Sequence, residues 1–380
     1  MFGGANLGNL LTTKTDDDAI TLVLAAYERG VRSFHVSSLY GGGLAEVRLG
    51  KALKILKEQH GARLSRDDIK LYITVGESPY SSDQEDPQDY DAPVPAVFKN
   101  PLHDKIRYQY DAAGIIESFR NSLARLQVTP ADLAGVLVHD LDLYTHIEDA
   151  YETHLAQFVY HGGYDALYSL KKKYDFKIGF ATRDTDLFAS LLEGGHEYDH
   201  LMLQGGYTLL ENNAFDSVLP VCMEHNVRVT IAGPFASGLL ASPEAGSWLH
   251  HREVQEGSTS LLKAQEVHRI CNESGVCMKQ AALQYPLTHP VIDTVAVGAD
   301  NLEQLVENCD LIKSPYLGGG FYEEILMVQE IDCEQGSSGL FSFLSQFEPA
   351  MPPPAALLCE DLPFNDSSID SASDADEATL

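Results

Sequence analysis

The sequence lacks the patterns that several classes of protein require. Six cysteines are scattered along 380 residues, and no two form a C-x-x-C pair. Because disulfide frameworks and zinc sites need paired or regularly spaced cysteines, we expect buried, reduced thiols. No apolar run approaches the ~18 residues that cross a bilayer. The opening MFGGANLGNL has neither the basic flank nor the apolar stretch of a secretory signal. We therefore predict a cytoplasmic protein that does not span a membrane.

Positive charge is also scarce. The chain has 26 Lys and Arg against 56 Asp and Glu, which gives a net charge of −30. Such a surface repels phosphate backbones, so we exclude nucleic acid as a partner. No Lys or Arg follows Lys313, and the last segment mixes Ser, Pro and acid without a helical or strand period. We expect a folded domain at 1–332 and a disordered acidic tail at 333–380. Two apolar stretches in the tail leave docking to a protein partner open, without supporting it.

Strand and helix patterns alternate along most of the chain. An amphipathic helix begins after Thr15, a candidate N-cap, and ends at Gly30. We expect further strands at 31–38, 69–75, 133–140, 177–182, 201–207, 228–233 and 292–298, further helices at 45–60, 112–126, 156–174, 186–194, 214–225, 260–274 and 301–312, and a long loop at 77–111. With a clipped first strand near residues 2–5, this is close to eight repeats and predicts a (β/α)8 TIM barrel of the α/β class. An open doubly wound sheet is the alternative, weakened because no G-x-G-x-x-G follows the first strand.

In such a barrel the catalytic side chains project from the carboxyl ends of the strands. This rule places six residues at one shared mouth: His35, Tyr40, Thr74, His139, Gln204 and Phe235. A purely structural role stays open for each, since Tyr40 can be a loop aromatic and His139 a satisfied core histidine. His196 and His200 have the i, i+4 spacing of metal ligands, but they straddle a helix end and a strand start. We therefore predict no metal site.

Several blocks of the sequence resemble one enzyme family. FHVSSLYGGGLAEVRLG, VLVHDLDLYTH, LQGGYTLLENNAFDSVLPVC and IAGPFASGLLASP are similar to segments of the aldo-keto reductases. The likeness covers about residues 1–315 and is nearest to the D-threo-aldose (L-fucose) 1-dehydrogenase and pyridoxal 4-dehydrogenase branch. The resemblance implies a (β/α)8 barrel that binds NADP(H) or NAD(H) and that catalyses with a tetrad of Tyr, Lys, Asp and His.

This chain matches the tetrad only in part. Tyr40 and His139 fall on the family's Tyr and His, but the Asp position is His35 and the Lys position is Thr74. A free phenol with a pKa near 10 is only about 0.1% ionised at pH 7. The resemblance assigns the stabilisation of the phenolate to the lysine that is missing here. Lys70 is about 13 Å away along its strand, too far to substitute. His35 either rescues the site, as a base or a cation, or belongs to a neutral cluster that has drifted from catalysis; both stay open.

The resemblance also points to a dinucleotide site. Family members read Pro-Gly-Ala-Arg after strand eight, whereas this chain reads Val-Gly-Ala-Asp. Asp300 therefore stands where those members have an arginine. A carboxylate repels the 2′-phosphate of NADP and accepts hydrogen bonds from the ribose hydroxyls of NAD, so we favour NAD. The resemblance further assigns Gln204 to the carboxamide, Phe235 to the nicotinamide face, and Gly298 and Asn308 to the dinucleotide.

These observations predict an NAD(P)-dependent oxidoreductase. We expect it to oxidise an aldose or similar hemiacetal at C1, or to reduce a small carbonyl, with a sugar or carbonyl compound as substrate. A non-catalytic barrel that binds a metabolite or a protein is the alternative. The opening MFGG stands where the family's first strand would be ending, so we expect either a truncated N-terminus or a first strand with few hydrogen bonds. The identity of the sugar and the oligomeric state stay open.

Overall fold

The computed structural model of the chain describes residues 1–60, 68–83, 88–242 and 259–329. Within these ranges one sheet has eight strands, each parallel to its neighbours and arranged in chain order. The strands are β1 (Phe2–Gly3), β2 (Ser33–Val36), β3 (Lys70–Val75), β7 (Leu133–His139), β8 (Lys177–Thr182), β9 (His200–Gln204), β10 (Arg228–Ala232) and β11 (Ile292–Ala296). The predicted (β/α)8 barrel is confirmed.

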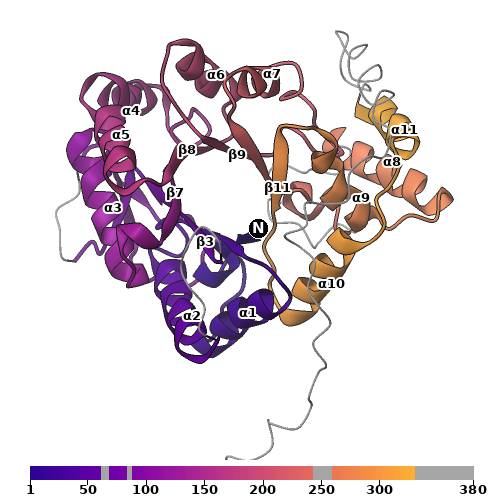
Figure 1. Cartoon of the computed structure of the whole chain (residues 1–380), viewed down its shortest axis with the longest axis horizontal. Coiled ribbons are helices and arrows are strands. Elements are labelled where there is room, and N and C mark those ends of the chain that lie inside the picture. The colour runs from indigo at the N-terminus through magenta and orange to yellow at the C-terminus, as the bar shows by residue number, and fades with distance from the viewer. Residues whose placement is uncertain (61–67, 84–87, 243–258, 330–380) are drawn as a thin grey trace, which may run out of the picture.

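A very short first strand closes the barrel. Phe2 pairs with Phe34 of β2 on one side and forms a parallel bridge with Val297 on the other. The backbone N–H of Gly3 donates to the carbonyl oxygen of Val297 at 3.0 Å. Figure 1 shows the N-terminus inside the ring of strands, beside β11. The two-residue strand therefore pairs with both neighbours, and it is as short as the sequence predicted.

Helices surround the strands as an outer ring (Figure 1). They are α1 (Asp16–Glu28), α2 (Leu44–His60), α3 (Ala112–Leu126), α4 (Glu148–Tyr160), α5 (Gly163–Tyr174), α6 (Thr185–Glu193), α7 (Val218–Glu224), α8 (Thr259–Glu273), α9 (Met278–Gln284), α10 (Leu302–Lys313) and α11 (Gly319–Gln329). Thr15 caps α1 as predicted, and its hydroxyl oxygen accepts from the N–H of Asp18 at 3.1 Å. The helix expected at 156–174 is instead two helices, because the chain turns at Gly162 with a φ of 80°.

The segment expected as a loop at 77–111 contains a small antiparallel sheet. Its strands, in the order β4-β6-β5, are β4 (Glu77–Tyr80), β6 (Lys105–Tyr108) and β5 (Ala92–Pro93). Gly76 separates β3 from β4 with a φ of 103°, and a Cβ there would lie 2.3 Å from the Tyr110 ring. The glycine lets the chain leave the barrel sharply, so β4 begins at the barrel mouth.

Packed side chains fill the interior of the barrel. Leu137, Ala181 and Met202 form a buried cluster there. Nearby, the ring of His200 lies 5.3 Å from that of Tyr72, and its Nε2 shares a hydrogen bond with the hydroxyl of Thr230 at 3.0 Å. The interior is therefore a core and not a channel, which leaves the carboxyl ends of the strands as the place for a site.

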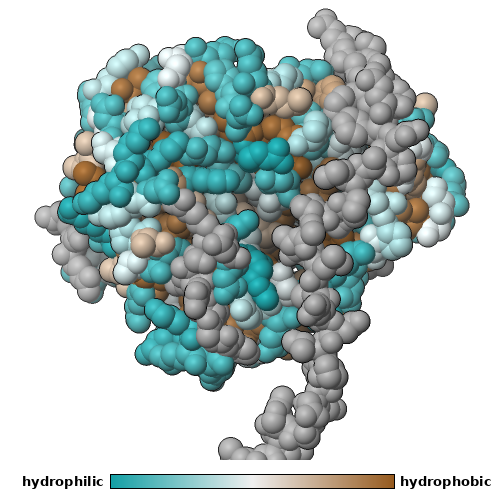
Figure 2. All heavy atoms as spheres, viewed as in Figure 1, coloured by the Kyte–Doolittle hydropathy of each residue, from teal (hydrophilic) through white to brown (hydrophobic). Residues whose placement is uncertain are grey.

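One face of the molecule is mostly polar where described residues form it. In Figure 2 hydrophilic side chains cover most of the face that looks along the barrel, and hydrophobic ones gather in small groups. No helix in the part of the chain that the structure describes is both long and apolar enough to span a bilayer. The acidic tail predicted at 333–380 lies outside the described residues.

Candidate active site

Four rings meet at the carboxyl ends of β2 and β7, where the sequence predicted a site. The centroid of the Tyr40 ring lies 6.1 Å from that of His35 and 6.0 Å from that of His139. Phe98 packs against the same phenol ring at 5.9 Å. Both imidazoles stand edge-on to the phenol, with interplanar angles of 77° and 85°. The structure thus brings three predicted site residues, Tyr40, His35 and His139, into one cluster.

The three glycines after Tyr40 fix the loop that carries it. Gly41, Gly42 and Gly43 all have a positive φ, a backbone conformation that residues with a side chain rarely adopt. A Cβ on Gly41 would lie 2.5 Å from the carbonyl oxygen of Gly8, and one on Gly42 would lie 2.3 Å from that of His103. The loop therefore packs directly against two other backbone segments. This close contact holds the phenol at the mouth of the barrel.

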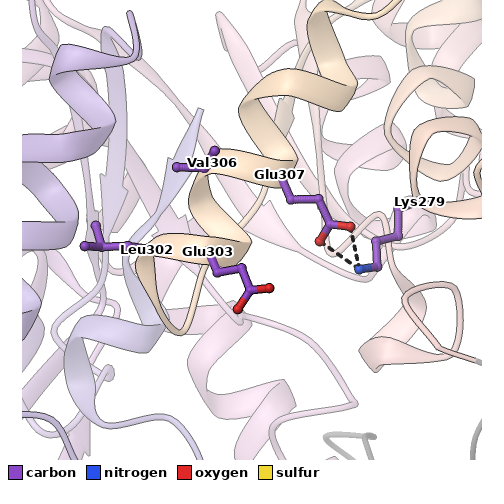
Figure 3. Close-up of a pocket in the computed structure, with 5 residues that line it drawn as sticks. All are labelled: Lys279, Leu302, Glu303, Val306 and Glu307. Atoms are coloured by element: carbon purple, nitrogen blue, oxygen red, sulfur yellow. Dashed lines mark hydrogen bonds and ion pairs between the residues drawn. The ribbon is translucent and has the colours of Figure 1, made fainter. Parts of the chain in front are cut away.

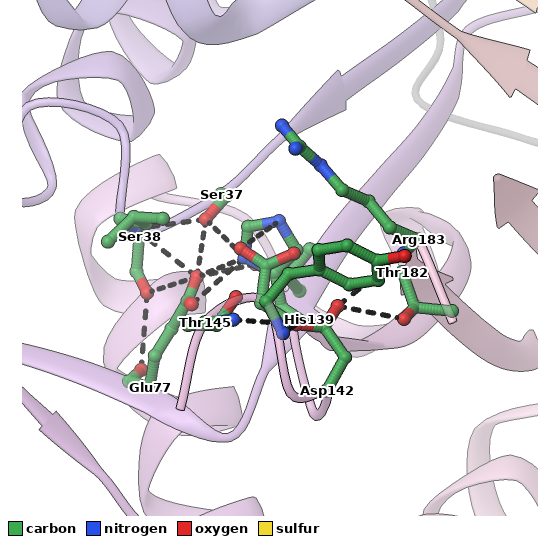
Figure 4. A network of polar contacts seen from close by, with 12 residues as sticks. Ser37, Ser38, Glu77, His139, Asp142, Thr145, Thr182 and Arg183 are labelled. Atoms are coloured by element: carbon green, nitrogen blue, oxygen red, sulfur yellow. Dashed lines mark hydrogen bonds and ion pairs between the residues drawn. The ribbon is translucent and has the colours of Figure 1, made fainter. Parts of the chain in front are cut away.

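Sequence reasoning missed one residue of the cluster, Glu77. Its carboxylate is fully buried, and both of its oxygens lie 2.9 Å from Nδ1 of His139. The hydroxyl of Thr74 donates to Oε1 at 3.0 Å, and the hydroxyl of Ser37 donates to the same oxygen. Figure 4 shows this carboxylate among its partners. An acidic residue that directly follows the end of a barrel strand and a glycine is the signal that could have identified it.

Glu77 and His139 form a buried ion pair. Burial alone would raise the pKa of Glu77, but the charge of His139 and the hydrogen bonds from His139, Ser37 and Thr74 lower that pKa to about 2. Burial would likewise lower the pKa of His139, but the carboxylates of Asp140 and Glu77 raise it to about 9. At neutral pH the pair is therefore a carboxylate and an imidazolium.

The residues at the two altered tetrad positions carry no charge. Burial, aided by the charge of His139, lowers the pKa of His35 to about 3, so this imidazole is neutral. Its Nε2 is buried and has no hydrogen-bond partner among the described residues. Thr74 is also buried and donates to Glu77. This environment disfavours rescue of the site by His35 as a cation, one of the roles left open by the sequence.

The phenol of Tyr40 stays protonated in this environment. Burial raises its pKa well above the ordinary value, and the carboxylates of Asp140 and Glu77 add to the effect. His139 presents its second nitrogen, Nε2, at 3.6 Å from a carboxylate oxygen of Asp140, beyond hydrogen-bond distance. The cluster therefore holds two proton donors near neutral pH, the phenol and the imidazolium.

Asp142 holds the loop that follows His139. One of its oxygens accepts from the backbone N–H groups of Tyr144 and Thr145, at 3.1 and 2.9 Å. The other oxygen accepts from the hydroxyl of Thr182 at 3.0 Å (Figure 4). These bonds tie the end of β7 to the end of β8, so the backbone beside His139 is held in place.

Two of the predicted cofactor residues lie at the same mouth. Gln204 is the exposed last residue of β9, and a Cβ on Gly233 would lie 3.9 Å from its side chain. Phe235 follows β10 and packs half-buried against the core. An exposed amide after β9 and an aromatic ring after β10 offer a donor, an acceptor and a flat apolar face. These groups fit a nicotinamide carboxamide and ring.

The other three cofactor residues gather after β11. The side-chain amide of Asn308 donates to the carbonyl oxygen of Gly298 at 3.4 Å. Asp300 lies just before α10, whose N-cap is Asn301. The hydroxyl of Thr12 donates to Oδ1 of Asp300 at 2.9 Å, and the ammonium of Lys14 forms an ion pair with the same oxygen.

These contacts decide what Asp300 can still bind. Burial would raise its pKa, but hydrogen bonds from Lys14 and Thr12 outweigh burial and lower it, so the carboxylate is charged. Among the described residues no donor reaches Oδ2, which leaves that oxygen able to accept from a hydroxyl. The carboxylate therefore fits the ribose of a dinucleotide, although Lys14 offsets part of the repulsion toward a 2′-phosphate.

A surface pocket of about 630 Å³ lies against α10 (Figure 3). It is lined by Lys279, Leu302, Glu303, Val306 and Glu307. The ammonium of Lys279 lies 2.7 and 2.9 Å from the two oxygens of Glu307, so that pair is already formed. Within the described ranges no three His, Cys, Asp or Glu side chains are grouped so that they could hold a metal ion.

Comparison with known proteins identifies the family of the chain. The sequence model of the aldo/keto reductase family matches residues 1–317. The chain belongs to the aldo/keto reductase family. It is 27% identical to pyridoxal 4-dehydrogenase of Microbacterium luteolum over 308 residues, covering 80% of this chain and 86% of the relative. It is 28% identical to D-threo-aldose 1-dehydrogenase of a Pseudomonas species over 314 residues, covering 81% and 87%.

Solved structures show the same fold. An aldo-keto reductase from Bacillus halodurans, in its holo form, matches with a TM-score of 0.62 at 21% identity, covering 86% of this chain and 90% of that one. A glycerol dehydrogenase from Gluconobacter oxydans matches with a TM-score of 0.64 at 15% identity, covering 87% and 90%. Members of this family are oxidoreductases that use NAD(P)H. The groups at the mouth and after β11 fit that cofactor.

Proposed function

We propose that this protein is an NAD-dependent oxidoreductase. It reduces a small carbonyl compound to an alcohol, or oxidises an aldose at C1. The observation that carries the proposal is the cluster at the barrel mouth. There the ring centroids of Tyr40 and His139 lie 6.0 Å apart. The buried carboxylate of Glu77 forms a hydrogen bond with the imidazole of His139. A phenol and an imidazolium at one mouth can both give a proton to a carbonyl oxygen.

The protonation states favour reduction near neutral pH. When bound, the reduced nicotinamide supplies hydride to the carbonyl carbon. Tyr40 then gives its proton to the carbonyl oxygen as negative charge develops there, while Nε2 of His139 can donate a hydrogen bond to the same oxygen. Oxidation of a hydroxyl needs a base instead. Because the pKa of His139 is about 9, we expect the oxidative direction to gain as the pH approaches that value.

The cofactor preference rests on Asp300. Its Oδ2 can accept from the ribose hydroxyls of NAD, whereas its charge opposes the 2′-phosphate of NADP. Gln204, Phe235, Gly298 and Asn308 complete the binding groups. The ion pair with Lys14 reduces the negative charge, so we expect NAD to bind more tightly than NADP without excluding it.

Two measurements test the proposal. Titration of the protein with NAD and NADP, followed by its intrinsic fluorescence, should show saturable binding that is tighter for NAD. No binding at millimolar concentrations would refute the enzyme and favour a non-catalytic barrel. The names of the relatives define a first substrate panel of pyridoxal and several aldoses. Turnover of a panel member by the wild type, lost in Tyr40→Phe while NAD still binds, would support the assignment of the phenol.

A further inference from the structure

Glu77 accepts hydrogen bonds from several groups besides His139. In addition to His139, Thr74 and the hydroxyl of Ser37, its Oε1 receives the backbone N–H of Leu39 at 3.2 Å. The hydroxyl of Ser38 lies 3.2 Å from the same oxygen. The donors other than His139 come from the end of β2 and the end of β3. The carboxylate is therefore anchored independently of His139, and its position does not depend on that side chain being charged.

The imidazole of His139 is oriented by this anchored carboxylate. Its Nδ1 lies 2.9 Å from each oxygen of Glu77, so the N–H at that position points at the carboxylate. Nε2 lies on the other side of the ring, 3.6 Å from a carboxylate oxygen of Asp140. Only 6% of His139 is exposed, which means that solvent does little to screen the pair.

We propose that Glu77 is a positioning residue that keeps His139 as an imidazolium, and that this cation balances the negative charge left on Tyr40 when its proton moves to substrate. The inference rests on the proposed function. Thr74 and His35 carry no charge and cannot stabilise a phenolate. The inference assigns this stabilisation to the ion pair between Glu77 of β4 and His139 of β7.

The step can be written with its atoms balanced. The carbonyl carbon gains a C–H bond from the hydride of the reduced nicotinamide, which is thereby oxidised. The C=O double bond becomes a single bond, and its oxygen takes the proton from the hydroxyl of Tyr40. The phenolate that remains lies beside the imidazolium of His139 until a proton from solvent restores it. No further oxidant or reductant is needed.

Charged and titratable groups face His139 from several elements. Glu77 lies on β4, Asp140 and Asp142 follow β7, and neutral His35 lies on β2. The phenol of Tyr40 faces the ring from the loop after β2, and Arg183, at the end of β8, acts on Asp140. Of these, Glu77 is the one that touches the imidazole with a hydrogen bond. The charge of Asp140 raises the pKa of His139 as well, but Glu77 contributes both its charge and this hydrogen bond, so its removal should lower that pKa.

The test measures the charge of His139 without using activity. In the full-length protein with labelled histidines, the imidazole signal that disappears in His139→Gln should titrate with a midpoint near pH 9. In Glu77→Gln this midpoint should fall by about one pH unit or more. Glu77→Asp should restore part of the difference. Glu46→Gln serves as the matched control, because it removes an equally buried carboxylate that pairs with Arg125 instead.

Kinetics then link this charge to the reaction. With the substrate panel, Glu77→Gln should lower carbonyl reduction at about pH 8 by about twofold if the midpoint falls by about one pH unit, and by about tenfold if it falls by about two, with NAD binding unchanged. An imidazole that is neutral at pH 7 in the wild type, or a midpoint that Glu77→Gln does not move, would overturn the inference even if the enzyme is active. A protonated His139 in a protein that binds no dinucleotide would instead refute the proposed function. An unchanged reduction rate despite a lowered midpoint would also overturn the inference.

Discussion

Replacement of Glu77 by glutamine should destabilise the fold by an amount that depends on pH. The pKa of His139 is raised from 6.5 to about 9, which corresponds to about 3 kcal/mol of folding free energy. A raised histidine pKa stabilises the folded state where the imidazole is protonated. This contribution is therefore fully present below about pH 6.5 and is lost as the pH rises through about 9. Since Asp140 supplies part of the shift, we expect Glu77→Gln to cost about 2 kcal/mol at about pH 6.

Urea unfolding followed by circular dichroism provides the assay. The loss in Glu77→Gln should shrink to less than about 1 kcal/mol at about pH 10, where His139 is neutral in both proteins. Asp16→Asn is the control: its carboxylate pairs with Arg48 at 2.9 Å and stays ionised across this range, so its cost should not change. In a double-mutant cycle with His139→Gln, the two losses should be less than additive. Equal losses at both pH values, or strict additivity, would refute the ion pair.

Three further predictions follow from single contacts. Asp300→Asn should raise affinity for NADP relative to NAD by about tenfold, because it removes a negative charge and releases Lys14; an unchanged ratio in fluorescence titrations would contradict this role. Gly179→Ala should cost about 3 kcal/mol or more in urea unfolding, because the new Cβ would lie 1.6 Å from a backbone oxygen of β9, whereas Gly318→Ala, with open space around it, should be neutral. Carbonyl reduction should fall, and alcohol oxidation should rise, as the pH passes about 9 and His139 loses its proton; rates independent of pH between about 7 and 10 would exclude that group.

The sequence predicted the barrel well because its signal is local and repeated. Each strand and helix carries its own period, and parallel strands bring their carboxyl ends to one side of the sheet. That rule places Tyr40 and His139 at one mouth from the sequence alone. The same reliance on local periodicity explains why the break between α4 and α5 at Gly162 was missed. A single glycine does not interrupt the apolar pattern around it.

The charges of the site could not be predicted in the same way. Glu77 was hidden in a segment expected to be a loop, and its approach to His139 depends on the turn at Gly76 and on strand β4 beyond it. The ion pair of Asp300 joins it to Lys14, 286 residues away, and no periodicity reports such a contact. The protonation state of His139 depends on burial and on neighbouring carboxylates, which only three-dimensional placement reveals.

The central claim is that Tyr40 and His139 form a working site despite the altered tetrad positions. Its most direct test is hydride transfer between NADH and the substrate panel, followed by NADH absorbance in the wild type and in Tyr40→Phe at equal NADH occupancy. We predict measurable reduction in the wild type and a fall of about 10²- to 10⁴-fold in the variant. Bound NADH that reduces no member of the panel, or equal rates in the two proteins, would contradict the account.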